Sequence, residues 1–299
     1  NARSYGLCWS LVRSFVHTYL KQDGTPFTAA ADYAVKSFAE EMEGRDLRLE
    51  QTVRGRNFLW DGKTAVADIK NLSLTGYQVI KYTLDESKYD GGAKNINSIP
   101  LIRYAEVLLN YAEAQAELGV LTDSEWALTV GALRKRAGIT GGTETLPTTV
   151  DSYLQRTFYP DVTSPVLLEI RRERTIELLQ EGHRYYDLIR WKEGKAFTQP
   201  LLGLYIPAKG EYDIDGDGTP DVYFATKGET PSTTAKLTLV IDQDILFSDG
   251  DHGYISPHKN NPGIWDETRD YFYPIPTDDR SLTGGALTQN PGWNDGLNF

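Results

Sequence analysis

Apolar side chains recur at helical spacing between Ile99 and Gly119, near the middle of the sequence. The residues that share this face are Ile102, Ala105, Leu108, Leu109, Ala112 and Ala116. Pro100 has the φ angle of a first helical turn, and Gly119 can adopt the left-handed conformation that ends a helix. The pattern therefore predicts one amphipathic helix over 99–119, with small alanines that allow a neighbouring helix to pack closely.

Two further helices are predicted on the C-terminal side of this one. The pattern indicates a helix over about 166–181 that ends at Gly182, followed directly by another over about 183–192. The short turn between them predicts a helix-turn-helix arrangement. The region from about 99 to 192 should thus form a packed helical core. The leucines expected in its interior are Leu108, Leu109, Leu178 and Leu188.

The remaining sequence shows weaker patterns. Helical spacing also occurs over 11–20 and about 29–42. Short apolar or alternating runs bounded by turn residues predict strands over 51–53, 77–82 and 237–241. From Gly203 onward, glycine, proline, aspartate and aromatic residues are frequent, which predicts mostly irregular structure.

These patterns together predict a mainly α fold with a few short strands. We expect a single domain over 1–299, because no stretch reads as a linker between independent units. Its helical core should cover about 99–192, flanked by loop-rich segments over 1–98 and 193–299. A hydrophobic content of 40% is sufficient for a real core.

The charge balance excludes one class of partner. The chain has 31 basic and 42 acidic residues, a formal net charge of −11, and no run of basic residues that could follow a phosphate backbone. Nucleic acid is therefore not expected as a ligand. The lone cysteine, Cys8, permits neither an internal disulfide nor a multi-cysteine metal site. Residues 1–20 lack the order of a signal peptide, so any targeting segment is expected to have been removed or to lie upstream.

Several sequence blocks resemble those of the SusD/RagB family, and they occur in the same order. The blocks are Arg45–Leu49, Arg103–Ala114, Glu169–Arg174, Asp187–Trp191, Tyr273–Pro276 and Gln289–Trp293. Two features depart from the family pattern. Leu47 replaces an expected proline, and family members are usually nearly twice as long and begin with a lipidated cysteine, whereas Cys8 follows no lipobox. The chain looks like the C-terminal portion of such a protein.

The resemblance implies both a fold and a function. The implied fold has tetratricopeptide-like helix pairs that support a loop-rich ligand-binding part. The implied protein is not an enzyme: it is a surface-exposed lipoprotein of the outer membrane that captures glycans or related nutrients. It would act as a lid on a SusC-like TonB-dependent transporter, held to the membrane by a lipid anchor upstream of this chain. Ligand-contacting positions in the family lie in variable loops and cannot be transferred from its motifs.

Two alternative functions fit a helical scaffold. A helical-repeat adaptor would bind only protein and would lack an exposed arc of aromatic rings. An α-helical glycoside hydrolase would need two carboxyl groups about 5 to 9.5 Å apart across a cleft. Glu169, Glu173 and Glu177 are spaced along one predicted helix, but they alternate with Arg171, Arg172 and Arg174. This pattern favours ion pairs at i,i+3 and i,i+4, which would keep the carboxylates ionised and unsuited to general acid catalysis.

The sequence from Asp213 to Asp221 resembles a calcium-binding loop. Carboxylates at loop positions 1, 3, 5 and 9, with glycine at position 6 and a backbone carbonyl at position 7, follow the order in which such a loop wraps Ca²⁺. The candidate ligands are Asp213, Asp215, Asp217, Thr219 and Asp221. Position 12 is Phe224 rather than a bidentate acid, so a structural Ca²⁺ of modest affinity is expected. The alternative is an Asp/Gly turn whose side chains bond their own backbone.

Glycan binding requires exposed aromatic faces, because the apolar face of a pyranose ring stacks on them. Rings in irregular segments are the natural candidates, since loops vary while the scaffold holds them. Tyr5, Trp9 and Trp60 precede the helical core, and Tyr254 and Trp265 follow it. We expect the first three to be the main stacking platforms and the last two to be the next candidates. For each ring, packing in the interior is the alternative.

Overall fold

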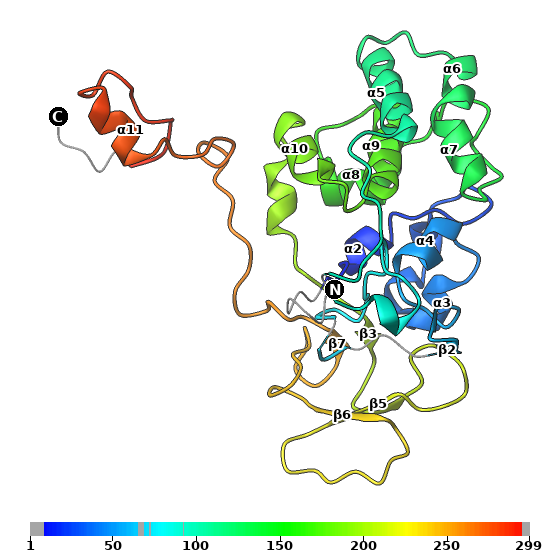
Figure 1. Ribbon diagram of the computed structural model, residues 1–299. Helices are drawn as coiled ribbons and strands as arrows, with labels where there is room; N and C mark the ends of the chain where they lie inside the picture. Colours follow the sequence, from blue (N-terminus) through cyan, green and yellow to red (C-terminus); the bar gives the residue numbers. More distant parts are fainter. Residues whose placement is uncertain (1–8, 65–68, 72, 92, 295–299) are drawn as a thin grey trace.

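The computed structural model describes residues 9–64, 69–71, 73–91 and 93–294 (Figure 1). The α-helices are α2 (Arg13–Val16), α3 (Phe38–Met42), α4 (Leu47–Thr52), α5 (Tyr104–Glu117), α6 (Asp123–Leu128), α7 (Val130–Arg136), α8 (Ser152–Phe158), α9 (Pro165–Glu177), α10 (His183–Arg190) and α11 (Thr277–Leu282). The 3-10 helices are η1 (Phe27–Ala29), η2 (Tyr33–Val35), η3 (Ser87–Tyr89) and η4 (Gly194–Thr198). The strands are β1 (Leu59–Trp60), β2 (Lys63–Thr64), β3 (Tyr205–Ile206), β4 (Gly210–Tyr212), β5 (Val222–Ala225), β6 (Leu237–Val240) and β7 (Gly253–Tyr254).

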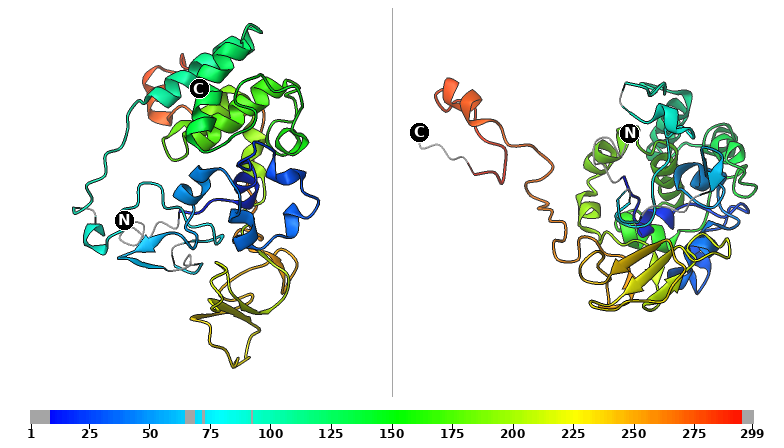
Figure 2. Two further views of the ribbon diagram at one scale, coloured as in Figure 1. Left: turned by 90° about the vertical axis from the view of Figure 1, so that its right-hand side faces the viewer. Right: turned by 60° about the horizontal axis from the view of Figure 1, so that its bottom comes forward.

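The elements form a helical body with a strand-rich end. Figure 1 shows α5 to α10 grouped together, the N-terminal helices α2 to α4 next to them, and β5 and β6 at the opposite end. Beyond the strands the chain runs back alongside the helices, and α11 stands apart from the rest in Figure 1 and in the right-hand view of Figure 2. The mainly α fold with a few short strands is therefore confirmed.

The central helix is shorter than predicted. It begins at Tyr104 and ends at Glu117, and Gly119 then has a φ of +71°. Residue 103 is extended, and its guanidinium group reaches the segment after α9, where its Nε donates to Glu181 at 2.6 Å. Ile102 is consequently exposed rather than on the packed face. Leu109 is fully buried, whereas Leu108 is only partly buried.

Three predicted elements in the N-terminal part differ from the structure. Residues 29–42 do not form one helix: η1 and η2 are separate turns, and α3 begins only where Ser37 and Glu40 form a capping box. Residues 51–53 do not form a strand, since α4 runs through Thr52. The helix forms because the Asp46 side chain caps its first turn and Leu49 is buried beneath it. The predicted strand over 77–82 is reduced to isolated bridges at Gln78 and Val79.

The chain after Gly203 is more regular than predicted. β4 pairs antiparallel with β5, and β5 pairs parallel with β6, which confirms the strand predicted over 237–241. β3 pairs with β7 in a separate ladder. Apolar residues of these strands, including Phe224 and Leu239, pack in one core with N-terminal residues such as Phe15 and Tyr77. Burial of one sheet face against the N-terminal segment stabilises strands that are each too short to persist alone.

Helix α9 is buried although charged residues dominate its sequence. Glu173 has no exposed surface, and its carboxylate contacts Arg48 at 2.6 Å and Arg134 at 3.1 Å. Glu177 accepts hydrogen bonds from Arg48 at 2.7 Å and from Arg103 and Arg136 at 2.5 Å. The predicted scaffold of ion pairs is present. Most pairs, however, join α9 to other segments, and Arg172 with Glu169 is an i,i+3 pair within the helix.

The arginines around Glu177 link its ionisation to the stability of the fold. Burial by itself would raise the pKa of Glu177, but Arg48, Arg136 and Arg103 lower it to about 2. Because the folded pKa lies below the unfolded value of 4.5, this group contributes about 3 kcal/mol above pH 4.5, which is lost as the pH falls towards 2. We expect urea unfolding at a series of pH values to show this loss. Glu177→Gln, which cannot titrate, should lose less stability over the same interval, and an unchanged pH profile would contradict the assignment.

The outer face of α5 carries apolar side chains that no other part of the described chain covers. Exposed residues on this face include Tyr104, Val107, Tyr111 and Leu118. Within the described residues, we find no helix with both the length and the apolar character needed to cross a bilayer. Contiguous exposed apolar residues of this kind are typical of contact surfaces.

Candidate functional site

The structure places the predicted stacking residues at separate locations. Tyr5 lies outside the described residues. Trp9 is 48% exposed, and its backbone carbonyl accepts a hydrogen bond from Val79. Trp60 lies in β1, where it pairs with Lys63 across a two-residue turn and is half-buried. Trp9 and Trp60 therefore both present part of a ring to solvent.

Tyr254 is held in place by contacts on several sides. Its ring packs 5.5 Å from the ring of Tyr205, and the guanidinium of Arg13 lies 5.2 Å from the ring centre. Its hydroxyl donates a hydrogen bond to the carbonyl of Ala34 at 3.0 Å. These contacts join β7 to the N-terminal segment, so the geometry of Tyr254 fits packing better than ligand contact.

Trp265 belongs to a set of neighbouring rings that we call the aromatic strip. The strip consists of Tyr185, Tyr186, Phe197, Trp265, Tyr271 and Tyr273. The Trp265 ring lies 5.1 Å from Phe197 and 5.1 Å from Tyr271. Tyr185 in α10 then connects Phe197, at 5.7 Å, to Tyr273, at 6.4 Å. Rings from α10, η4 and residues 265–273 thus form one continuous surface.

Two rings of the aromatic strip are open to solvent. Tyr186 is 70% exposed and Tyr273 is 71% exposed, and both contact Tyr185, while the other rings of the strip are half-buried. A hydrogen bond with Tyr273 raises the pKa of Tyr185 to about 12, so the Tyr185 phenol is neutral at pH 7. The polar edge of the strip includes Glu267, which accepts a hydrogen bond from the Tyr271 hydroxyl at 3.0 Å. Aromatic faces bordered by a few polar groups are typical of small-molecule sites.

Close glycine packing fixes the position of Trp265. Gly194 lies directly beneath the indole, where a Cβ atom would come within 2.0 Å of the ring. The Gly194 amide also donates a hydrogen bond to the Tyr271 hydroxyl at 3.0 Å. Residue 194 must therefore be glycine for η4 to approach the ring. The two adjacent tyrosines of α10 were the sequence signal that could have revealed the strip.

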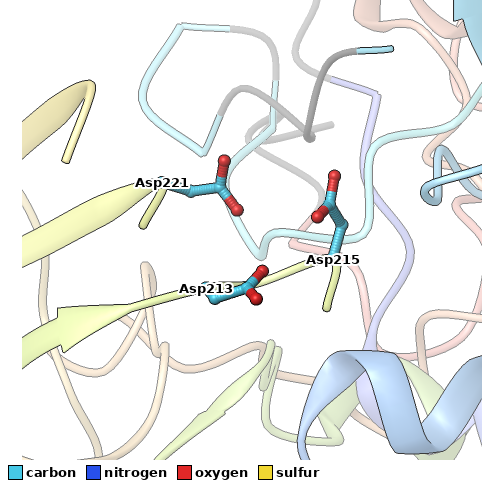
Figure 3. Close-up of side chains that lie close together, drawn as sticks. All are labelled: Asp213, Asp215 and Asp221. Carbon is cyan, nitrogen blue, oxygen red and sulfur yellow. The ribbon is translucent and has the colours of Figure 1, made fainter. Parts of the chain in front are cut away.

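The acidic loop brings together three of its five candidate ligands. Asp213, Asp215 and Asp221 each offer a carboxylate oxygen, and these oxygens all lie within 4.8 Å of one another (Figure 3). Asp217 and Thr219 are exposed, and the Asp217 carboxylate accepts a hydrogen bond from the Thr219 amide instead. Burial, followed by the charges of Asp221, Asp217 and Asp213, raises the pKa of Asp215.

The carboxylates of α9 are not arranged as an acid and a nucleophile. A general acid needs a raised pKa, whereas the arginines around Glu169 hold its pKa below the usual value despite burial. The arginines around Glu177 likewise lower its pKa, to about 2. The geometry of α9 therefore supports a structural role and does not favour the hydrolase alternative.

A family model described as the SusD family matches residues 2–293. The chain is similar to the solved structure of a SusD-like protein from Bacteroides fragilis NCTC 9343, with 23% sequence identity and a TM-score of 0.58. The alignment covers 94% of this chain and 46% of the B. fragilis chain. A SusD-like carbohydrate binding protein from the same organism has 23% sequence identity and a TM-score of 0.58, and the alignment covers 91% of this chain and 47% of that protein. The protein BT4246 has 19% sequence identity and a TM-score of 0.62, and the alignment covers 96% of this chain and 45% of BT4246. The chain spans less than half the length of these structures, and at such identities the likeness concerns the fold. No curated protein sequence matches the chain.

Proposed function

Because the chain belongs to the SusD family, we propose that it binds glycans or related nutrients at the cell surface without changing them chemically. In this proposal it works as part of a surface-exposed lipoprotein of the outer membrane, anchored through a lipid upstream of the chain. The captured ligand passes to a SusC-like TonB-dependent transporter. The family match and the carbohydrate-binding B. fragilis protein of the same fold support the choice of ligand class.

The aromatic strip is the observation that carries the proposal within this chain. Sugar rings have apolar faces that stack on aromatic side chains, and a series of rings offers successive contacts to a linear glycan. Tyr186 and Tyr273 expose most of their surface, so a ligand reaches them without rearrangement of the fold. The ring of Tyr185 contacts both of them and joins them to Phe197, which in turn contacts Trp265.

We expect Tyr186→Ala and Tyr273→Ala each to weaken glycan binding by at least about tenfold, equivalent to about 1.4 kcal/mol. The reason is that each substitution removes an exposed stacking face while leaving the interior intact. Titration calorimetry with soluble starch, laminarin, xylan and mannan measures the change, and circular dichroism checks that the variants fold. Exposed substitutions of this kind should alter stability little.

A matched control and the other predicted rings complete this experiment. Tyr111→Ala removes an exposed tyrosine on α5, outside the aromatic strip, and should bind glycan as the parent does. Trp9→Ala and Trp60→Ala test the platforms expected from the sequence. If the parent binds a glycan and only these tryptophan variants lose affinity, the ligand site lies at the N-terminal rings. Absence of binding to every glycan in the panel would contradict the proposed function.

The adaptor alternative is favoured by one observation, the exposed apolar face of α5. Val107 and Leu118 on this face are 50% and 74% exposed, which suits contact with another protein better than contact with a sugar. If the folded chain binds no glycan, that result would favour the adaptor alternative. The α5 face and the aromatic strip consist of different residues, so a protein bound to α5 would leave the aromatic strip open.

A further inference from the structure

The strand pairing explains why three aspartates meet at one point. β4 and β5 are antiparallel, and Tyr212 pairs with Val222 at the end of the ladder. Asp213 follows Tyr212 and Asp221 precedes Val222, so this pairing brings the two aspartates opposite each other. Gly216 and Gly218 have φ angles of +77° and +88°, which let the loop fold back and place Asp215 beside them. Figure 3 shows the three carboxylates directed toward a common space.

One carboxylate oxygen in this group is buried without a hydrogen bond. The Asp221 side chain is only 2% exposed, and its Oδ1 accepts no hydrogen bond from any residue that the structure describes. Its Oδ2 accepts a hydrogen bond from the Ile214 amide at 3.0 Å. The nearest cation is Lys236, whose Nζ lies 3.6 Å from Oδ1, and this lysine side chain is 64% exposed. A buried carboxylate oxygen whose ion-pair partner is an exposed lysine 3.6 Å away is poorly compensated, so this geometry favours the binding of a cation.

The donor set selects the kind of cation. All three groups supply carboxylate oxygen, which suits hard cations such as Ca²⁺ and Mg²⁺ rather than zinc or copper. Two oxygens bound to one Ca²⁺ can be up to about 5 Å apart, whereas the limit for Mg²⁺ is about 4 Å. Because the oxygens here lie within 4.8 Å of one another, they can all reach a single Ca²⁺ with little movement.

We propose that Asp213, Asp215 and Asp221 bind one Ca²⁺ ion that fixes the loop between β4 and β5 against helix α3. This ligand set differs from the sequence expectation, because Asp217 and Thr219 lie on the exposed side of the loop. Ca²⁺ takes six to eight oxygens, so water and backbone carbonyls complete its coordination. The role is structural and does not depend on glycan binding.

Contacts of the loop show what the ion would stabilise. Gly216 approaches α3 so closely that a Cβ atom there would lie 3.0 Å from the Cβ of Ala39. Asp215 lines a pocket of about 190 Å³ together with residues of α3 and of the 55–58 segment, including Phe38, Met42 and Phe58. Neutralising the carboxylates would remove their mutual repulsion at this contact. The strand-rich end would then be held more firmly to the helical body.

The test uses the whole chain and Ca²⁺ alone. After treatment with EDTA and dialysis, titration calorimetry with CaCl2 should show one site, and about 5 mM Ca²⁺ should raise the Tm, because a ligand of the folded state stabilises it by mass action. Asp221→Asn keeps an oxygen for the Ile214 amide but removes the buried charge. We expect it to weaken Ca²⁺ binding at least tenfold and to abolish the rise in Tm.

Asp242→Asn is the matched control. Asp242 follows β6 in the same strand-rich end, is exposed, and has a φ of +62° that asparagine tolerates. This variant should bind Ca²⁺ as the parent does. The proposal is overturned if the parent shows neither heat nor a change in Tm with Ca²⁺, or if Asp221→Asn binds Ca²⁺ as tightly as the parent. An equal response to Mg²⁺ would overturn the choice of Ca²⁺.

Discussion

Glu177→Ala is expected to lower the free energy of unfolding by about 3 to 5 kcal/mol, the range seen when one partner of a buried ion pair is removed. Glu177 is 4% exposed and accepts hydrogen bonds from Arg48, Arg103 and Arg136. When the Glu177 carboxylate is removed, Arg136 loses a charged partner. Arg48 and Arg103 lose one of their carboxylate partners each and keep the others. Like-charged guanidinium groups would then face one another at the C-terminal end of α9.

Urea denaturation followed by circular dichroism measures this change. Glu117→Ala is the matched control, because Glu117 also lies near a helix end but is exposed. That variant should differ from the parent by less than about 0.5 kcal/mol, as surface substitutions usually do. A loss below 1 kcal/mol for Glu177→Ala would show that the ion pairs of α9 contribute little to stability.

Leu109→Ala is expected to cost about 2 to 5 kcal/mol, because it removes buried methyl groups and leaves a cavity. Leu109 has no exposed surface and packs with Trp126 and Ile170 between α5, α6 and α9. Leu108, which the sequence pattern places in the same core, is partly buried, so its replacement should cost less.

The control for this substitution lies on the same helix. Leu118 forms the C-cap of α5 and is 74% exposed. Leu118→Ala should leave the denaturant midpoint nearly unchanged. If the two alanine variants melt at the same urea concentration, the packing of α5 on α9 does not sustain the fold.

The sequence predicts the long helices well because their signals are local. The i, i+3, i+4 spacing of α5 and the stop at Gly119 require no knowledge of the rest of the chain. Short helices were missed for a different reason. α6 and α7 are separated at Thr129, whose φ of −112° and ψ of −95° interrupt the helix. The capping box of Thr122 and Glu125 was the available local signal for α6.

The candidate sites depend more strongly on tertiary structure. The acidic loop could be recognised because its candidate ligands lie within nine residues, yet only the strand register shows that Asp213 and Asp221 face each other. The aromatic strip combines rings from α10 with rings of the C-terminal segment, and nothing in the sequence places Tyr185 beside Tyr273. The loop setting of Trp265 predicts a candidate stacking residue, but the sequence does not identify its neighbours.

The ion pairs of α9 also constrain how this sequence can change during evolution. Arg48, Arg103 and Arg134 come from different segments, and each contacts a carboxylate of α9. A charge reversal at one of them would bury two like charges together, so it is tolerated only with a matching change in the partner. We therefore expect pairs such as Arg134 and Glu169 to covary among homologous sequences, although they are distant along the chain.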